Sequence, residues 1–314
     1  MRNLTLLFVL ALALVAPSCN RETPRAGDKK TVALVLKTLN HPFFVDMRRG
    51  AQEAADRLGV TLQVQAAERE IDVDKQMQIV ENLLQTGIDV LAITPSGSRE
   101  IVSALVKATA ANVPIVIVDT RLDAKAAADA GVQAKTFIGS DNYEGGKLAG
   151  EYVVRTTGGK ARIGILEGIP GHETGDSRLR GFRDAVSRSA AISIVASQPA
   201  NWERDQGFNV FQNMLQAHPD IDTVFAASDL MALGAIEAIA AGGKTGKIRV
   251  IGFDALDDAK KAIAAGTMEA SVAQFPYEMG KAAVESAVKV MNGETLPPDI
   301  MVKLEMITKA SGSR

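Results

Sequence analysis

Polar and aromatic side chains recur in this sequence at points where short apolar runs end. Carboxylates and amides can pair with hydroxyl groups, and flat aromatic faces pack against C–H surfaces. Together they are typical of a site for a small polyhydroxylated molecule. Taken singly, Asp119 or Asp254 is explained equally well as a turn former, so the hypothesis depends on the whole set. Its members are Lys37, Asp119, Asp141, Ser228, Asp254 and Gln274, with Phe43, Trp202 and Phe253.

Signatures of catalysis are missing from the same sequence. No G-x-G-x-x-G follows a strand pattern, and no G-x-S-x-G occurs. The segment 242–247 resembles a phosphate loop but leads from a helix into a strand, the reverse of the required order. The three histidines, His41, His172 and His218, lack paired ligand spacing. We therefore expect no enzyme, no cofactor and no metal site.

The segment 31–58 predicts the first element that positions these residues. Residues 32–36 form an apolar run typical of a strand buried on both faces, and helical spacing of apolar residues follows from Phe44 to Leu58. Asn40 is the expected helix cap, and Pro42 suits the first helical turn. Open α/β sheets bind ligands at the carboxyl ends of their strands, which is where this turn lies.

The same alternation of strand and helix continues along the chain and predicts an α/β protein with two doubly wound parallel sheets. We expect Ser98 to cap a helix over 98–111 and a loop or short helix over 119–135. We expect one last strand within 301–307. The expected strands are 60–65, 90–93, 113–118 and 136–139, then 161–166, 192–196, 223–226, 248–253 and 270–273.

The N-terminus differs in composition from the rest of the 314 residues. Met1 and Arg2 precede an apolar run over 4–15, which is too short to span a bilayer, and Cys19 is the single cysteine. We expect residues 1–19 to be a signal peptide and 20–30 a flexible tether. Cys19 resembles the lipid-modified cysteine of a bacterial lipobox, although simple secretion with cleavage nearby is the alternative. The net charge of −2 gives no indication of nucleic-acid binding.

Several longer segments together resemble the periplasmic ribose-binding protein family, the sugar-binding subunits of bacterial ABC importers. They include TVALVLKTLNHPFF, VPIVIVDT, LEGIPG followed by Arg178, VFAASDLMALGAI, VIGFD and ASVAQFP. The resemblance covers residues 31 to about 303 and implies two lobes joined by a three-segment hinge. The implied lobes are 31–140 with 275–303, and 141–274 with 304–314, and the hinge candidates are Ser140, Gln274 and Lys303.

The resemblance also assigns roles to residues in the cleft between the lobes. Phe43, Phe44, Trp202 and Phe253 would enclose a sugar ring, and Asp119, Asp254 and Gln274 would bind its hydroxyls. Five positions depart from the family pattern: Lys37, His41, Thr120, Asp176 and Ser228. Thr120 and Asp176 stand where the family has arginines. Arg121 lies one residue after the first of these positions and should therefore point away from the cleft. We therefore expect a ligand other than ribose: another pentose or hexose, a polyol, or an amino sugar that meets Asp176 or Glu173.

These features predict an exported, lipid-anchored, monomeric solute-binding protein of the periplasm or cell envelope. It would capture a sugar or polyol and deliver it to a membrane permease with its ATPase. A sugar-sensing receptor module would use the same cleft and stays open as an alternative. A LacI-type regulatory core would need a DNA-reading segment where the export signal stands, and a hydrolase would need a nucleophile that the sequence does not show.

Overall fold

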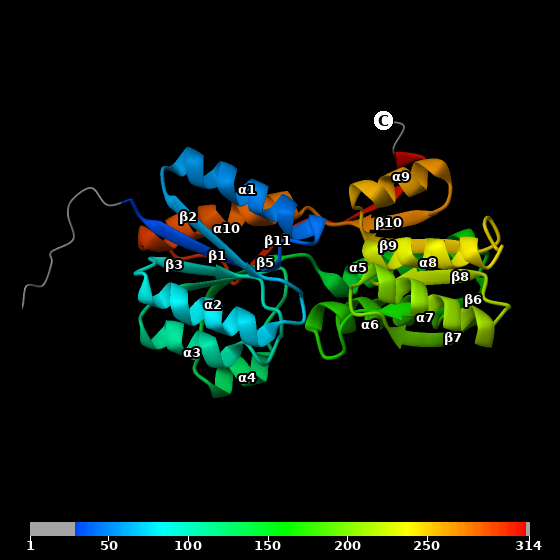
Figure 1. Ribbon diagram of the computed structural model, residues 1–314, viewed down its shortest axis with the longest axis horizontal. Coiled ribbons are helices and arrows are strands. Elements are labelled where there is room, and N and C mark those ends of the chain that lie inside the picture. The colour runs from blue at the N-terminus through cyan, green and yellow to red at the C-terminus, as the bar shows by residue number, and fades with distance from the viewer. Residues whose placement is uncertain (1–28, 312–314) are drawn as a thin grey trace, which may run out of the picture.

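The computed structural model describes residues 29–311, which form two lobes side by side along the long axis of the molecule (Figure 1). Each lobe contains one six-stranded sheet with helices on both faces. The α/β class with two doubly wound sheets is therefore confirmed. Within these residues, no helix has both the length and the apolar character that crossing a membrane requires.

The first lobe is built on an entirely parallel sheet with the strand order β11-β5-β4-β3-β1-β2. Alternate residues of β1 face opposite layers: Val32 and Leu34 pack with α1 and α10, whereas Ala33 and Val35 pack with α2 and α3. This two-sided burial explains the continuous apolar run of β1. The elements are β1 (Thr31–Thr38), α1 (Pro42–Leu58), β2 (Thr61–Ala67), α2 (Val73–Gln85), β3 (Val90–Ile93), α3 (Val102–Ala110), β4 (Ile115–Val118), α4 (Ala124–Asp129), β5 (Ala134–Gly139), α10 (Pro276–Met291) and β11 (Asp299–Met301).

The second lobe repeats this plan with the strand order β12-β10-β9-β8-β6-β7, in which only the edge strand β12 is antiparallel. Helices α5 and α6 cover one face, and α7 and α8 cover the other. Its elements are α5 (Asn142–Thr156), β6 (Lys160–Glu167), α6 (Glu173–Val186), β7 (Ala191–Pro199), α7 (Arg204–Ala217), β8 (Thr223–Ala226), α8 (Asp229–Ala241), β9 (Arg249–Asp254), α9 (Asp257–Ala265), β10 (Ala270–Ala273) and β12 (Glu305–Thr308).

The chain passes between the lobes three times. The crossings follow β5, β10 and β11, so Ser140, Gln274 and Lys303 lie at or beside them. The third crossing separates β11 from β12, and the single strand that we expected within 301–307 is therefore wrong. Residues between these two short strands connect the two lobes and cannot belong to either sheet.

Two expected helix caps are also wrong. The side chain of His41, not that of Asn40, accepts the backbone N–H of Phe43, because the Asn40 amide donates to the carbonyl of Glu68 instead. Helix α3 begins at Val102, four residues after the expected cap. The hydroxyl of Ser98 accepts the backbone N–H of Glu173 from the other lobe. Both polar groups serve long-range contacts, which local propensity does not register.

Candidate functional site

A cavity lies between the two lobes, at the carboxyl ends of the strands. Both lobes contribute to its wall, and most of the side chains that line it are buried. The lining residues are Lys37, His41, Phe43, Phe44, Glu70 and Asp119 from the first lobe, and Thr174, Arg178, Trp202, Ser228, Asp254 and Gln274 from the second lobe or its crossing.

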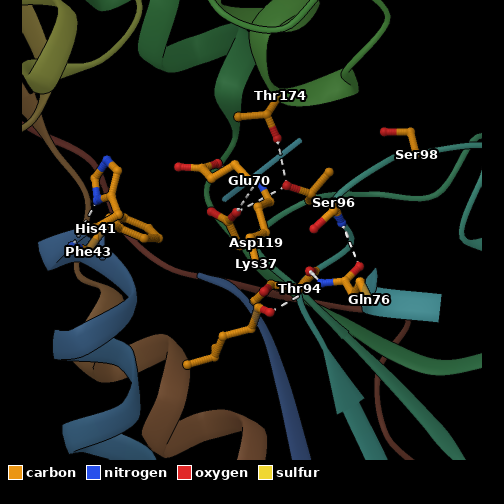
Figure 2. A network of polar contacts seen from close by, with 12 residues as sticks. Lys37, His41, Phe43, Glu70, Gln76, Thr94, Ser96, Ser98, Asp119 and Thr174 are labelled. Carbon is orange, nitrogen blue, oxygen red and sulfur yellow. Dashed lines mark hydrogen bonds and ion pairs between the residues drawn. The ribbon is translucent and has the colours of Figure 1, made fainter. Parts of the chain in front are cut away.

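A lysine between two carboxylates forms one wall of the cavity (Figure 2). Lys37 Nζ lies 3.4 Å from Asp119 Oδ2 and 3.6 Å from Glu70 Oε2, and the Lys37 side chain is 3% exposed. The Thr120 hydroxyl donates to Asp119 Oδ2 at 3.0 Å. Burial raises the pKa of Glu70, and the neighbouring Lys37 charge opposes that rise. The Lys37 charge therefore offsets part of the cost of burying the Glu70 carboxylate.

An aromatic corner at the start of α1 completes the first-lobe wall. The Phe43 and Phe44 rings meet edge to face at 5.3 Å, and Lys37 Nζ lies 5.6 Å from the Phe44 ring centre. Burial lowers the pKa of His41, which favours the neutral imidazole. Because His41 Nδ1 accepts the Phe43 N–H, Nε2 carries the remaining ring hydrogen. His41 therefore acts as a hydrogen-bond donor at its free nitrogen.

A buried arginine organises the second-lobe wall. Arg178 Nε donates to Asn142 Oδ1 at 2.8 Å, and Nη1 donates to the Ala227 carbonyl at 2.7 Å. Nη1 also lies 3.6 Å from Asp254 Oδ1. The guanidinium stacks 3.8 Å from the centre of the Phe253 ring, which supports it from below. These contacts fix the planar group so that it presents its charge to the cavity.

Two buried polar atoms in this wall have no hydrogen-bond partner among the described residues: Trp202 Nε1 and Gln274 Oε1. The other end of the Gln274 amide donates to Asp254 Oδ1 at 2.8 Å. An unpaired buried donor or acceptor costs about 1–3 kcal/mol. A ligand that accepts from the indole and donates to the amide would remove both costs, which is what hydroxyl groups can do.

Three residues of the wall have unusual backbone conformations. Asp119, Trp202 and Asp254 have φ angles of 65°, 67° and 109°, although none of them is glycine. Such conformations cost about 1–3 kcal/mol each and persist only where the surroundings enforce them. Asp119 directly follows β4, Asp254 is the last residue of β9, and Trp202 lies three residues after β7; all three line the cavity. The sequence contains no glycine or asparagine at these positions that would have indicated the turn.

Contacts between the lobes close the cavity. Thr120 Oγ1 lies 3.2 Å from Thr174 Oγ1 on α6, and Glu173 N donates to Ser98 Oγ at 3.2 Å. At the edge of the cleft, the Arg69 guanidinium lies 3.8 Å from Glu203 Oε1. The structure therefore shows the two lobes in a closed arrangement.

Most side chains expected in the site lie around this one cavity. Thr120 lies behind Asp119, and Phe253 lies beneath Arg178. Arg121 points away, as expected, because it pairs with Asp299 and stacks on Phe137. Cys19 lies outside the described residues. The expected residues that line the cavity are Lys37, His41, Phe43, Phe44, Asp119, Trp202, Ser228, Asp254 and Gln274.

The expectation for Asp176 is not met by the geometry. Helix α6 begins at Glu173, so Thr174 and Arg178 lie one turn apart and both face the cavity, whereas Asp176 is exposed between them. The inference that a second arginine had been lost from the cleft is therefore wrong, since Arg178 provides it. Arg178 lies one helical turn after Thr174, so a correct placement of the helix would have put both residues on the face that lines the cavity. Glu70 was not expected in the site either, because it lies in an irregular turn between β2 and α2, where no periodic pattern marks it.

Comparisons with known proteins agree with this geometry. A family model described as a periplasmic binding protein domain matches residues 32–295. The ribose import binding protein of Escherichia coli is 39% identical over 281 residues, which cover 90% of this chain and 91% of that protein. The D-allose-binding periplasmic protein of Escherichia coli is 33% identical, covering 88% and 89%. A solute-binding protein structure from Actinobacillus succinogenes with bound D-allose superposes with a TM-score of 0.85 at 37% identity, covering 91% of this chain and 99% of that one.

Proposed function

The chain belongs to the periplasmic binding protein family, and from this premise we propose that it is the solute-binding component of an ABC importer. It holds a monosaccharide or related polyol between its lobes and delivers it to a membrane permease. The observation that carries this proposal is the cavity itself, where acidic, amide and cationic groups from both lobes surround a space bordered by aromatic rings. The relatives are named as binding proteins, and we assign no bond-making or bond-breaking step to the cleft.

The charges of the wall favour a neutral ligand. Two cations, Lys37 and Arg178, lie near three carboxylates, Glu70, Asp119 and Asp254, and both cations are within ion-pair distance of a carboxylate. Neither cation lacks a nearby carboxylate, and burial raises the pKa of both Glu70 and Asp254, so the wall carries no uncompensated charge that would select a charged ligand. With Arg178 present, ribose and allose become the first candidates, and an amino sugar bound through Asp176 loses its support.

Closure would couple binding to transport. A ligand that contacts both walls stabilises the closed arrangement relative to the open one by its differential affinity for the two. The two unpaired atoms, Trp202 Nε1 and Gln274 Oε1, give this difference a physical origin because a bound ligand would satisfy them. The closed form would then be the one that the permease recognises.

The cellular setting belongs to the same proposal. The family places the chain in the periplasm, and the apolar N-terminal run supports export. We further propose that Cys19 carries a lipid anchor, that an ATPase powers the permease and that the binding protein acts as a monomer. Mass spectrometry of membrane-extracted protein would test the anchor, and sedimentation would test the monomer.

Isothermal titration calorimetry of the purified mature chain tests the proposed function. We expect saturable one-to-one binding of D-ribose or D-allose, with myo-inositol as a polyol comparison. Asp254→Asn should weaken that binding by about tenfold to a hundredfold, because it removes a charged hydrogen-bond acceptor from the wall. If none of a broad panel of sugars and polyols binds or raises the melting temperature, the proposal is wrong.

A further inference from the structure

Asp229 is a completely buried carboxylate that does not line the cavity. It is the first residue of α8, and its exposed fraction is 0%. One carboxylate oxygen accepts the Ser271 hydroxyl at 2.7 Å, and the other accepts the Leu256 backbone N–H at 2.7 Å. Burial and the nearby Asp254 carboxylate raise the pKa of Asp229. A carboxyl group is expensive to keep in a core unless directed hydrogen bonds satisfy it, which indicates that these contacts have a use.

Those contacts converge on the turn that carries Asp254 into the cavity. Asp254 and its neighbour Ala255 have φ angles of 109° and 53°, a region that favours glycine. The Ser271 oxygen accepts the Ala255 N–H at 3.0 Å, while Asp229 accepts the next N–H, that of Leu256. Asp229 and Ser271 together therefore hold two consecutive amides of a turn that would otherwise relax.

The neighbouring strand leaves room for this arrangement. Gly252 lies beside Ser271 in the pairing of β9 with β10, and a methyl group added at Gly252 would overlap Asp229 Oδ1. The carboxylate thus occupies space that only glycine leaves open. A glycine, a serine and an aspartate from three separate elements form the niche behind the turn.

We propose that Asp229 and Ser271 are positioning residues for ligand binding, which hold the 254–255 turn so that the Asp254 carboxylate faces the ligand. This inference rests on the proposed function of the cleft. Neither residue touches the ligand space. Without them Ala255 returns to an ordinary backbone conformation, Asp254 turns away, and the Gln274 amide that donates to Asp254 Oδ1 loses its partner.

The variants Asp229→Asn and Ser271→Ala, each with and without Ala255→Gly, test the inference in calorimetry with D-ribose and D-allose. Each single variant should weaken binding by about tenfold to a hundredfold, since a buried backbone N–H of the turn loses its acceptor. Adding Ala255→Gly to either variant should raise its affinity for the sugar again by at least threefold, because glycine adopts this backbone conformation without support. Ser286→Ala, which removes a buried hydroxyl in α10 of the other lobe, is the matched control and should bind like wild type.

A purely structural role predicts something different: lower stability of both variants, unchanged affinity and no rescue by glycine. That result overturns the inference.

Crystal structures of the ligand-free variants give a readout that needs no sugar. We expect Asp254 and Ala255 to leave the positive φ region in at least one of the two single variants; if both keep it, the inference is wrong. If wild-type protein binds neither sugar while the turn still collapses in the variants, the proposed ligand class fails and the positioning of the turn stands.

Discussion

At the scale of single residues, Arg178 connects the stability of the second lobe with its binding surface. The same guanidinium donates to Asn142 and Ala227, stacks on Phe253 and faces Asp254. A lysine at this position keeps the charge but loses the planar fork that makes several directed bonds at once. Replacing Arg178 by another cation should therefore lower both the stability of the second lobe and the affinity for the ligand.

We expect Arg178→Lys to weaken sugar binding by about a hundredfold and to lower the free energy of unfolding by about 2 kcal/mol, because buried acceptors are left unpaired. Calorimetry and urea denaturation measure the two effects. Arg180→Lys is the matched control, since Arg180 lies on the same helix and is exposed. An Arg178→Lys variant with wild-type affinity would contradict the role given to the guanidinium.

Trp202 is the single tryptophan of the chain, so its fluorescence reports on the cavity alone. We expect saturating sugar to change the emission, because its buried Nε1 gains a hydrogen-bond partner and its surroundings lose water. Trp202→Phe should abolish the signal and weaken binding about tenfold through the lost donor. Unchanged emission at a sugar concentration that calorimetry shows to be saturating would mean that the indole does not meet the ligand.

The site residues that sequence could predict share one property: most follow an apolar run that ends as a strand. Asp119 and Asp254 were found in this way, because strand ends in parallel sheets meet at one edge. Arg178 was not among the expected ligand residues, because the family resemblance pointed to Asp176, which lies two residues earlier on α6. A shift of that size on a helix moves a different face towards the cleft.

At the scale of elements, three pairs of helices pack through the same reciprocal glycine contact. In each pair, a glycine of one helix faces the backbone three residues before a glycine of the other, and a methyl group at either glycine would overlap that backbone. Such close approach is possible only without a β-carbon. The glycine pairs are Gly50 and Gly280 in α1 and α10, Gly146 and Gly181 in α5 and α6, and Gly207 and Gly234 in α7 and α8.

Gly280→Ala should therefore force α10 away from the Met47 carbonyl of α1. Overpacking of this kind costs about 1–3 kcal/mol, and in a domain of this size each kcal/mol lowers the melting temperature by about 2–4 °C. Differential scanning calorimetry measures the shift. Gly242→Ala is the control, because the nearest atom to an added methyl group there is 3.4 Å away. Equal melting temperatures for the two variants would show that the helices adjust without cost.

The order of elements was predictable because buried strands read as apolar runs and intervening helices as periodic stripes. Boundaries were less predictable where a polar side chain bonds across the fold. Asn40 and Ser98 look like caps in sequence but bond to Glu68 and Glu173. The segment 119–135, expected to be a loop or short helix, contains α4 and the start of β5. The first residues of β5 are exposed, so the sequence shows no apolar run there.

At the scale of the whole molecule, closure depends on a small contact between the lobes near Ser96 and Ser98. Gln76 fixes this loop on the first lobe: its amide donates to the Thr94 carbonyl and accepts the Ser96 N–H at 2.8 Å (Figure 2). From the second lobe, the His172 imidazole lies against the Ser96 backbone, and its Nδ1 has no partner among the described residues. A proton added to this imidazole would therefore be buried on closing.

Burial is the main reason that the pKa of His172 falls to about 4 in the closed form, and the Lys37 charge lowers it further. Glu100 and Asp119 oppose this fall but do not reverse it. When the lobes separate, solvent surrounds the imidazole and its ordinary pKa of 6.5 returns. The open form then holds more protons than the closed form between these two values, so closure is fully favoured above pH 6.5 and weakens as the pH falls towards 4.

We therefore expect the apparent Kd for sugar to rise as the pH falls from 7 to 4.5, and His172→Gln to remove the larger part of that rise. The full difference between 6.5 and about 4 corresponds to between two and three orders of magnitude in affinity, since each pKa unit is a factor of ten. The variant is needed because burial also lowers the pKa of His41, which acts in the same direction, and raises that of Glu70, which acts in the opposite one. Calorimetry of wild type, His172→Gln and the distant control His218→Gln at each pH separates these contributions. A pH profile that His172→Gln leaves unchanged would show that this imidazole does not sense closure.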